Sequence, residues 1–88
     1  MTTQPPGRPF EEARILWQGR LKEARLVYEQ AVAQTETALN EGDPAKPAAE
    51  VALARRLALF REAAAREQYV RVLTTYADLV VRGIVPEE

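Results

Sequence analysis

The sequence predicts an all-α protein: an antiparallel hairpin of two helices that dimerises into a four-helix bundle. Two long stretches without proline are separated by residues 40–47, NEGDPAKP, a segment rich in helix-breaking residues. Both stretches carry apolar residues at spacings of three and four, as helices do that pack on another helix. The second stretch is apolar over more of its circumference than one neighbouring helix can cover, which predicts the dimer.

The first helix is predicted over residues 10–40, after a tail at residues 1–9 whose three prolines and glycine predict disorder. Pro9 is tolerated in a first helical turn, and Glu11 and Glu12 stand where acidic side chains favour the helix dipole. One face of this helix collects Phe10, Ala13, Trp17, Leu21, Ala24, Tyr28, Ala31, Thr35, Ala38 and Leu39. We name this face the Trp17 seam and expect it to lie against the second helix.

A linker at residues 41–46 precedes the second helix, which is predicted over residues 47–82. Lys46 stands before a proline and is therefore biased away from helical backbone angles. Gly83 suits the left-handed residue that commonly ends a helix. Residues 83–88 are therefore predicted to form a C-terminal tail.

The apolar residues of the second helix form stripes that point in different directions. In its second half, one side is lined by Tyr69, Val72, Tyr76 and Leu79. In its first half, nearly the opposite side is lined by Leu53, Leu57, Phe60 and Ala64. The flank between the two stripes carries Ala52, Leu59, Ala63, Val70, Leu73 and Ala77. A helix of the same chain covers one stripe, so we expect a second copy to cover another.

These patterns predict the residues that hold the helices of the bundle together: Trp17, Leu21, Tyr28, Leu53, Leu57, Phe60, Tyr69, Val72, Tyr76 and Leu79. Ile15 and Leu26 project about 160–180° away from the Trp17 seam, with Gly19 between them. They are predicted to form a face for a second partner, although two scattered surface apolar residues would produce the same pattern.

The chain has no histidine, serine or cysteine. General acid–base catalysis near neutral pH most often uses histidine, and nucleophilic catalysis most often uses serine or cysteine. We therefore predict that the protein is not an enzyme and that it binds no cofactor. One alternative is a helical bundle that binds a metal through carboxylates alone, with Glu62 as a ligand. We favour an ion pair of Glu62 with Arg55 or Arg66 instead.

The net charge of −1 argues against a protein dedicated to nucleic-acid binding. The densest basic stretch, Arg55 to Arg71, scatters its arginines around the helix, so a small regulator of the antitoxin type is kept as an alternative only. No apolar run approaches the roughly 18 residues of a membrane span. The N-terminus lacks the apolar core of a secretory signal. We therefore predict a cytoplasmic protein without membrane insertion.

The function predicted from these features is a non-catalytic interaction or structural module. Such a module would be a small adaptor, scaffold or accessory subunit whose helix faces hold a larger assembly together. Its predicted partners are a second copy of itself and a larger protein. The excess of arginine over lysine, ten to two, indicates a GC-rich genome more than a function.

Overall fold

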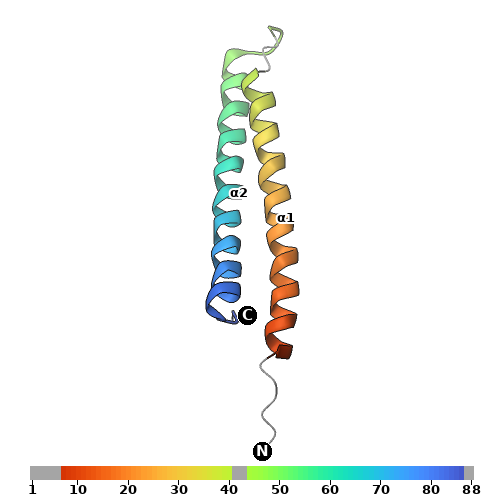
Figure 1. Ribbon diagram of the computed structural model, residues 1–88. Helices are drawn as coiled ribbons and strands as arrows, with labels where there is room; N and C mark the ends of the chain where they lie inside the picture. Colours follow the sequence, from red (N-terminus) through yellow and green to blue (C-terminus); the bar gives the residue numbers. More distant parts are fainter. Residues whose placement is uncertain (1–6, 41–43, 87–88) are drawn as a thin grey trace, which may run out of the picture.

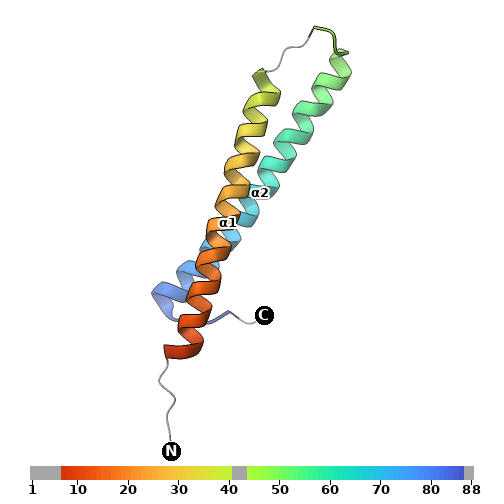
Figure 2. The same cartoon turned by 90° about the vertical axis from the view of Figure 1, so that its right-hand side faces the viewer.

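The computed structural model describes residues 7–40 and 44–86 of the protein. They form two helices, α1 (Gly7–Asn40) and α2 (Ala48–Arg82), which run antiparallel and pack against each other (Figure 1). Figure 2 shows that the two helices cross at a shallow angle. The described ranges contain no strand. The predicted all-α hairpin is confirmed, and its pairing into a four-helix bundle stays a prediction.

Helix α1 begins at Gly7, three residues before the predicted start at Phe10. Pro9 allows this because the first backbone N–H groups of a helix have no acceptor within it, so a missing N–H costs nothing there. The earlier start leaves the first turn without an acidic residue, so Glu11 does not stand where the sequence placed it. Residues 1–6 of the predicted tail lie outside the described residues.

Helix α2 begins at Ala48, directly after the extended Pro47 (φ −58°, ψ 143°), and ends at Arg82 as predicted. Gly83 has the left-handed conformation expected of it, with φ 69° and ψ 19°. Its N–H donates to the carbonyl of Leu79 at 3.1 Å, and the N–H of Ile84 donates to the carbonyl of Asp78 at 3.2 Å. The bond from Gly83 to the carbonyl four residues back is the one that defines the αL ending of a helix. Parts of the predicted linker and C-terminal tail, 41–43 and 87–88, lie outside the described residues.

The core of the hairpin is a narrow seam between the two helices. Its buried side chains are Ala31, Thr35, Val72 and Leu79. The hydroxyl of Thr35 lies 3.1 Å from the carbonyl oxygen of Ala58 on the other helix. That contact requires a close approach of the two backbones, which the small side chains on the seam permit. Further along, the rings of Tyr28 and Tyr69 stack at 5.8 Å between centroids.

Candidate functional site: the uncovered apolar faces

Seven of the ten predicted interface residues lie on the seam inside the hairpin. Val72 and Leu79 are buried, and the half-buried members are Trp17, Leu21, Tyr28, Tyr69 and Tyr76. These seven side chains therefore hold α1 against α2 within one chain. Of the ten residues assigned to the Trp17 seam, nine are buried or half-buried, and Leu39 is the exception at 46% exposed.

The other three predicted interface residues face away from the seam. Leu53, Leu57 and Phe60 are 55%, 45% and 73% exposed. Together with Ala64, which is also exposed, they form a stripe on the loop half of α2, the half nearer to the connection between the helices. We call these four residues the ridge. The described part of the hairpin leaves roughly half or more of each large side chain of the ridge in contact with water.

Ile15 and Leu26 also face away from the seam, at 64% and 48% exposed. Gly19 lies between them, and a Cβ atom built on it would meet no other atom within 4 Å. The backbone of α1 is therefore open to the surroundings at this position. The structure thus places both residues of the predicted second face on the surface of the hairpin.

A third apolar stripe runs along α2, turned away from both the seam and the ridge. Leu59, Val70, Leu73 and Val80 are 46%, 52%, 41% and 46% exposed. We call these four residues the flank. Val80 was missed in the sequence analysis, although its spacing of seven from Leu73 continues the same line of the helix.

Exposed apolar surface dominates the described part of the chain. Fifteen large apolar side chains are between 41% and 81% exposed, whereas the buried apolar side chains are Ala31, Val72 and Leu79. Single exposed apolar residues are common on any protein, but contiguous stripes of them mark binding surfaces. The arrangement can therefore bind another apolar helix or sheet face.

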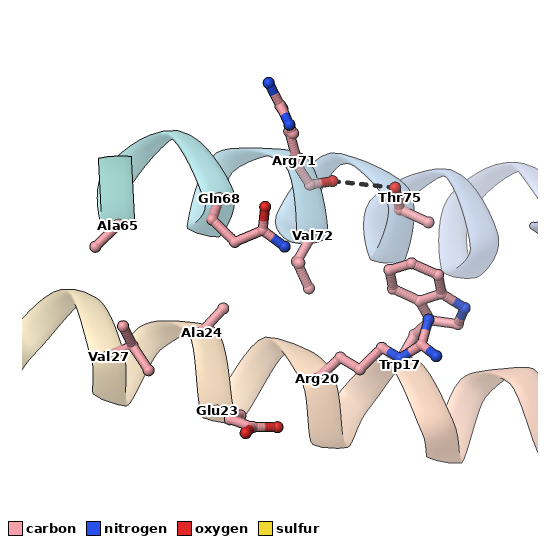
Figure 3. Close-up of a pocket in the computed structure, with 10 residues that line it drawn as sticks. All are labelled: Trp17, Arg20, Glu23, Ala24, Val27, Ala65, Gln68, Arg71, Val72 and Thr75. Atoms are coloured by element: carbon pink, nitrogen blue, oxygen red, sulfur yellow. Dashed lines mark hydrogen bonds between the residues drawn. The ribbon is translucent and has the colours of Figure 1, made fainter. Parts of the chain in front are cut away.

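A groove opens between α1 and α2 in the half of the hairpin away from the loop (Figure 3). It holds about 410 Å³, and its lining consists of Trp17, Arg20, Glu23, Ala24, Val27, Ala65, Gln68, Arg71, Val72 and Thr75. Ala24 and Ala65 are too small to fill the space between the helices, which leaves the hollow. The sequence carried part of this signal, since Ala24 falls on the Trp17 seam, but only the register of the two helices shows that Ala24 and Ala65 line one groove.

Arginine side chains stand at the rim of the groove. The guanidinium of Arg20 lies over the ring of Trp17, 4.6 Å from the ring centroid. Arg71 points away from α1 in Figure 3 and pairs with Glu67 at 2.7 Å. The groove therefore has an apolar floor and a rim of polar and charged side chains, which is the usual composition of a protein–protein contact.

Charged side chains pair mainly within their own helix. Arg14 and Glu11 lie 2.9 Å apart, and the hydrogen bond that Arg14 donates to the Glu11 carboxylate raises the pKa of Arg14 above its ordinary value. Such exposed pairs add little to stability. Arg55 donates to the carbonyls of Ala38 and Leu39 at the end of α1, at 3.5 and 3.4 Å. This contact caps α1 and takes the place of the expected pairing of Arg55 with Glu62.

The described ranges lack two features that would indicate other kinds of function, a cluster of metal ligands and a membrane-spanning helix. Within them, no three acidic side chains come together as metal ligands would. Neither described helix is long and apolar enough to cross a membrane. No protein-family model matches the chain, and no curated protein or solved structure is significantly similar to it.

Proposed function

We propose that the protein is a non-catalytic module that binds other helices through its exposed apolar stripes, in the first place the helices of a second copy. The observation that carries this proposal is the imbalance between three buried apolar side chains and fifteen large exposed ones. A hairpin with so small a core gains at most a few kcal/mol from folding alone. Binding a partner is the direct way to bury the remaining surface.

The free energy gained by burying apolar surface between two copies can be estimated. Removing apolar surface from water contributes about 25 cal/mol per Å². A contact of standard size removes about 800 Å² from each partner, of which somewhat more than half is apolar. The gross gain is then on the order of 20 kcal/mol before the entropy of association is subtracted. Because a domain with so small a core keeps only a few kcal/mol of net stability, the part of this gain that remains after the entropy of association couples folding to assembly in this proposal.

Thermal unfolding at several chain concentrations tests the proposal. When the folded state is an assembly, the melting temperature rises with chain concentration, since mass action favours the bound form. We expect helical circular dichroism to melt several degrees higher at about 100 μM than at about 1 μM. A melting temperature independent of concentration, together with a cooperative transition of a monomer, would contradict the proposal.

A further inference from the structure

We propose that the second copy packs antiparallel on the face that carries the ridge and the groove, with the ridge of each copy seated in the groove of the other. This inference rests on the proposed function and names the partner surface and its orientation. It assigns roles to a hollow and to exposed leucines that the folding of one hairpin does not explain.

The ridge and one wall of the groove lie on a single line of α2. The ridge holds residues 53, 57, 60 and 64, and the line continues through the groove residues Gln68, Arg71 and Thr75. Steps of three and four residues keep all seven positions within about 40° of one direction. The same face of the hairpin therefore carries the ridge in its loop half and the mouth of the groove in its other half.

A two-fold axis brings these two features together. In a symmetric dimer the same patch serves both copies, so a protruding region must meet a hollow on the same surface. Helix α2 spans residues 48–82, and its middle is residue 65. Two hairpins that overlap along their full length in antiparallel orientation place Phe60 of one copy level with residue 70 of the other, and Leu57 level with residue 73. The groove extends along α2 over 65–75.

Helix crossing supplies the sideways shift that the fit requires. Two stacked α2 helices that cross at about 20°, the usual angle in bundles, diverge on either side of their crossing point. At this angle the axis of one α2 is displaced sideways by about 3 Å at Phe60 and about 4 Å at Leu57, and a crossing of the right hand directs this displacement toward the space between the partner's helices. The crossing point falls one residue from Ala64, whose small exposed side chain allows close approach.

The face is large enough to hold a dimer together. Helix α2 has 35 residues and is therefore about 52 Å long at 1.5 Å per residue. Two helices of about 10 Å width present a face of about 1,000 Å², against about 800 Å² per partner in a stable interface. The flank lies on another side of α2, and none of its residues lines the groove.

Paired charge substitutions test which face is buried. Leu57 and Leu59 are nearly equally exposed, at 45% and 46%. Leu57 belongs to the ridge, whereas Leu59 belongs to the flank. We expect Leu57→Glu to raise the dissociation constant of the dimer at least 100-fold, because it buries an unpaired charge. Leu59→Glu should leave the dissociation constant within about threefold of the natural chain, because its side chain stays in water. The opposite result would place the dimer on the flank and overturn the inference, while the proposed function would stand.

Cysteine crosslinking tests the geometry without disturbing the fold, since the chain has no cysteine of its own. Ala64→Cys should form a disulfide between the two copies on mild oxidation with diamide, because the axis brings both Ala64 positions together. Ala63→Cys, exposed and turned by about 100°, is the matched control and should stay reduced. Crosslinking of Ala63→Cys in place of Ala64→Cys would overturn the inference.

Spin labels on Ala49→Cys separate the two orientations. Ala49 is exposed near the start of α2, at the loop end of the hairpin. In the antiparallel dimer the two labels lie at opposite ends, about 48 Å apart along the helix axis. A separation below about 20 Å, two helix diameters, would mean parallel hairpins and would overturn the inference. A chain that is a stable monomer would instead contradict the proposed function itself.

Discussion

Leu79 is completely buried, at 0% exposed, near the end of α2. Two positions further along, Val81 is 81% exposed. The two residues differ in direction by about 160° because consecutive helical positions turn by 100°. Two apolar residues close in the sequence therefore have different roles. Leu79 packs in the seam of the hairpin, and Val81 lies on its outer surface.

This contrast gives a direct prediction for the seam. Leu79→Ala removes buried methyl groups and leaves a cavity, so we expect it to lower the free energy of unfolding by about 2–5 kcal/mol. Val81→Ala should change it by no more than about 0.5 kcal/mol. Urea unfolding of both variants at one chain concentration measures the difference. Equal losses in the two variants would contradict the register of α2.

Replacing Gly83 or Gly19 by alanine is expected to change the stability of the protein in opposite directions. Gly83 has φ 69°, so Gly83→Ala should cost about 1–2 kcal/mol of stability by straining the left-handed ending of α2. Gly19 lies inside α1 with open space around it, so Gly19→Ala should add about 0.5–1 kcal/mol. Thermal unfolding of the two variants at matched concentration checks the signs, and a loss in Gly19→Ala would show that something approaches the helix there.

At the scale of the helices, α2 carries more than one packing surface. Its seam stripe serves α1, whereas the ridge and the flank remain for other partners. Helix α1 has its own outward face at Ile15 and Leu26. We propose that the dimer uses the ridge and that the outward face of α1 serves a larger protein.

The division of faces can be tested with two leucines of similar exposure, Leu57 at 45% and Leu26 at 48%. Leu57→Glu should produce monomers and lower the melting temperature, since a buried unpaired charge costs more than the contact it replaces. Leu26→Glu should leave the dimer intact and weaken only the binding of an outside partner. Light scattering and melting of the two variants side by side measure this. Monomers from Leu26→Glu with an intact Leu57→Glu dimer would reverse the assignment of faces.

The sequence predicted the fold closely because helices follow from local signals. The end of α2 at Arg82 was predicted from Gly83, whose special backbone conformation is a property of the residue itself. The start of α1 was missed because Pro9 permits a helix to begin before it as well as at it. The groove could not be predicted, since it depends on which residues of two separate segments face each other. Ala24 and Ala65 both line the groove only because of the register that the two helices adopt.

As a whole, the molecule is a long, narrow hairpin in which the seam is thin and the outside is unusually apolar. Near the loop, the seam is built from small side chains such as Ala31 and Thr35, while Leu53 and Phe60 point outward. In this half of the hairpin, a single copy in water therefore exposes its larger apolar groups and buries its smaller ones. We propose that pairing of two copies buries these larger groups and that the stable folded state is the assembly.

Sedimentation equilibrium of the natural chain at micromolar concentration tests this claim most directly. One chain has a mass of 9.9 kDa, and a dimer has twice that mass. We predict the mass of a dimer that dissociates on dilution, with loss of helical circular dichroism in the same concentration range. A species of 9.9 kDa that keeps its helical signal and unfolds cooperatively at high denaturant concentration would contradict the account.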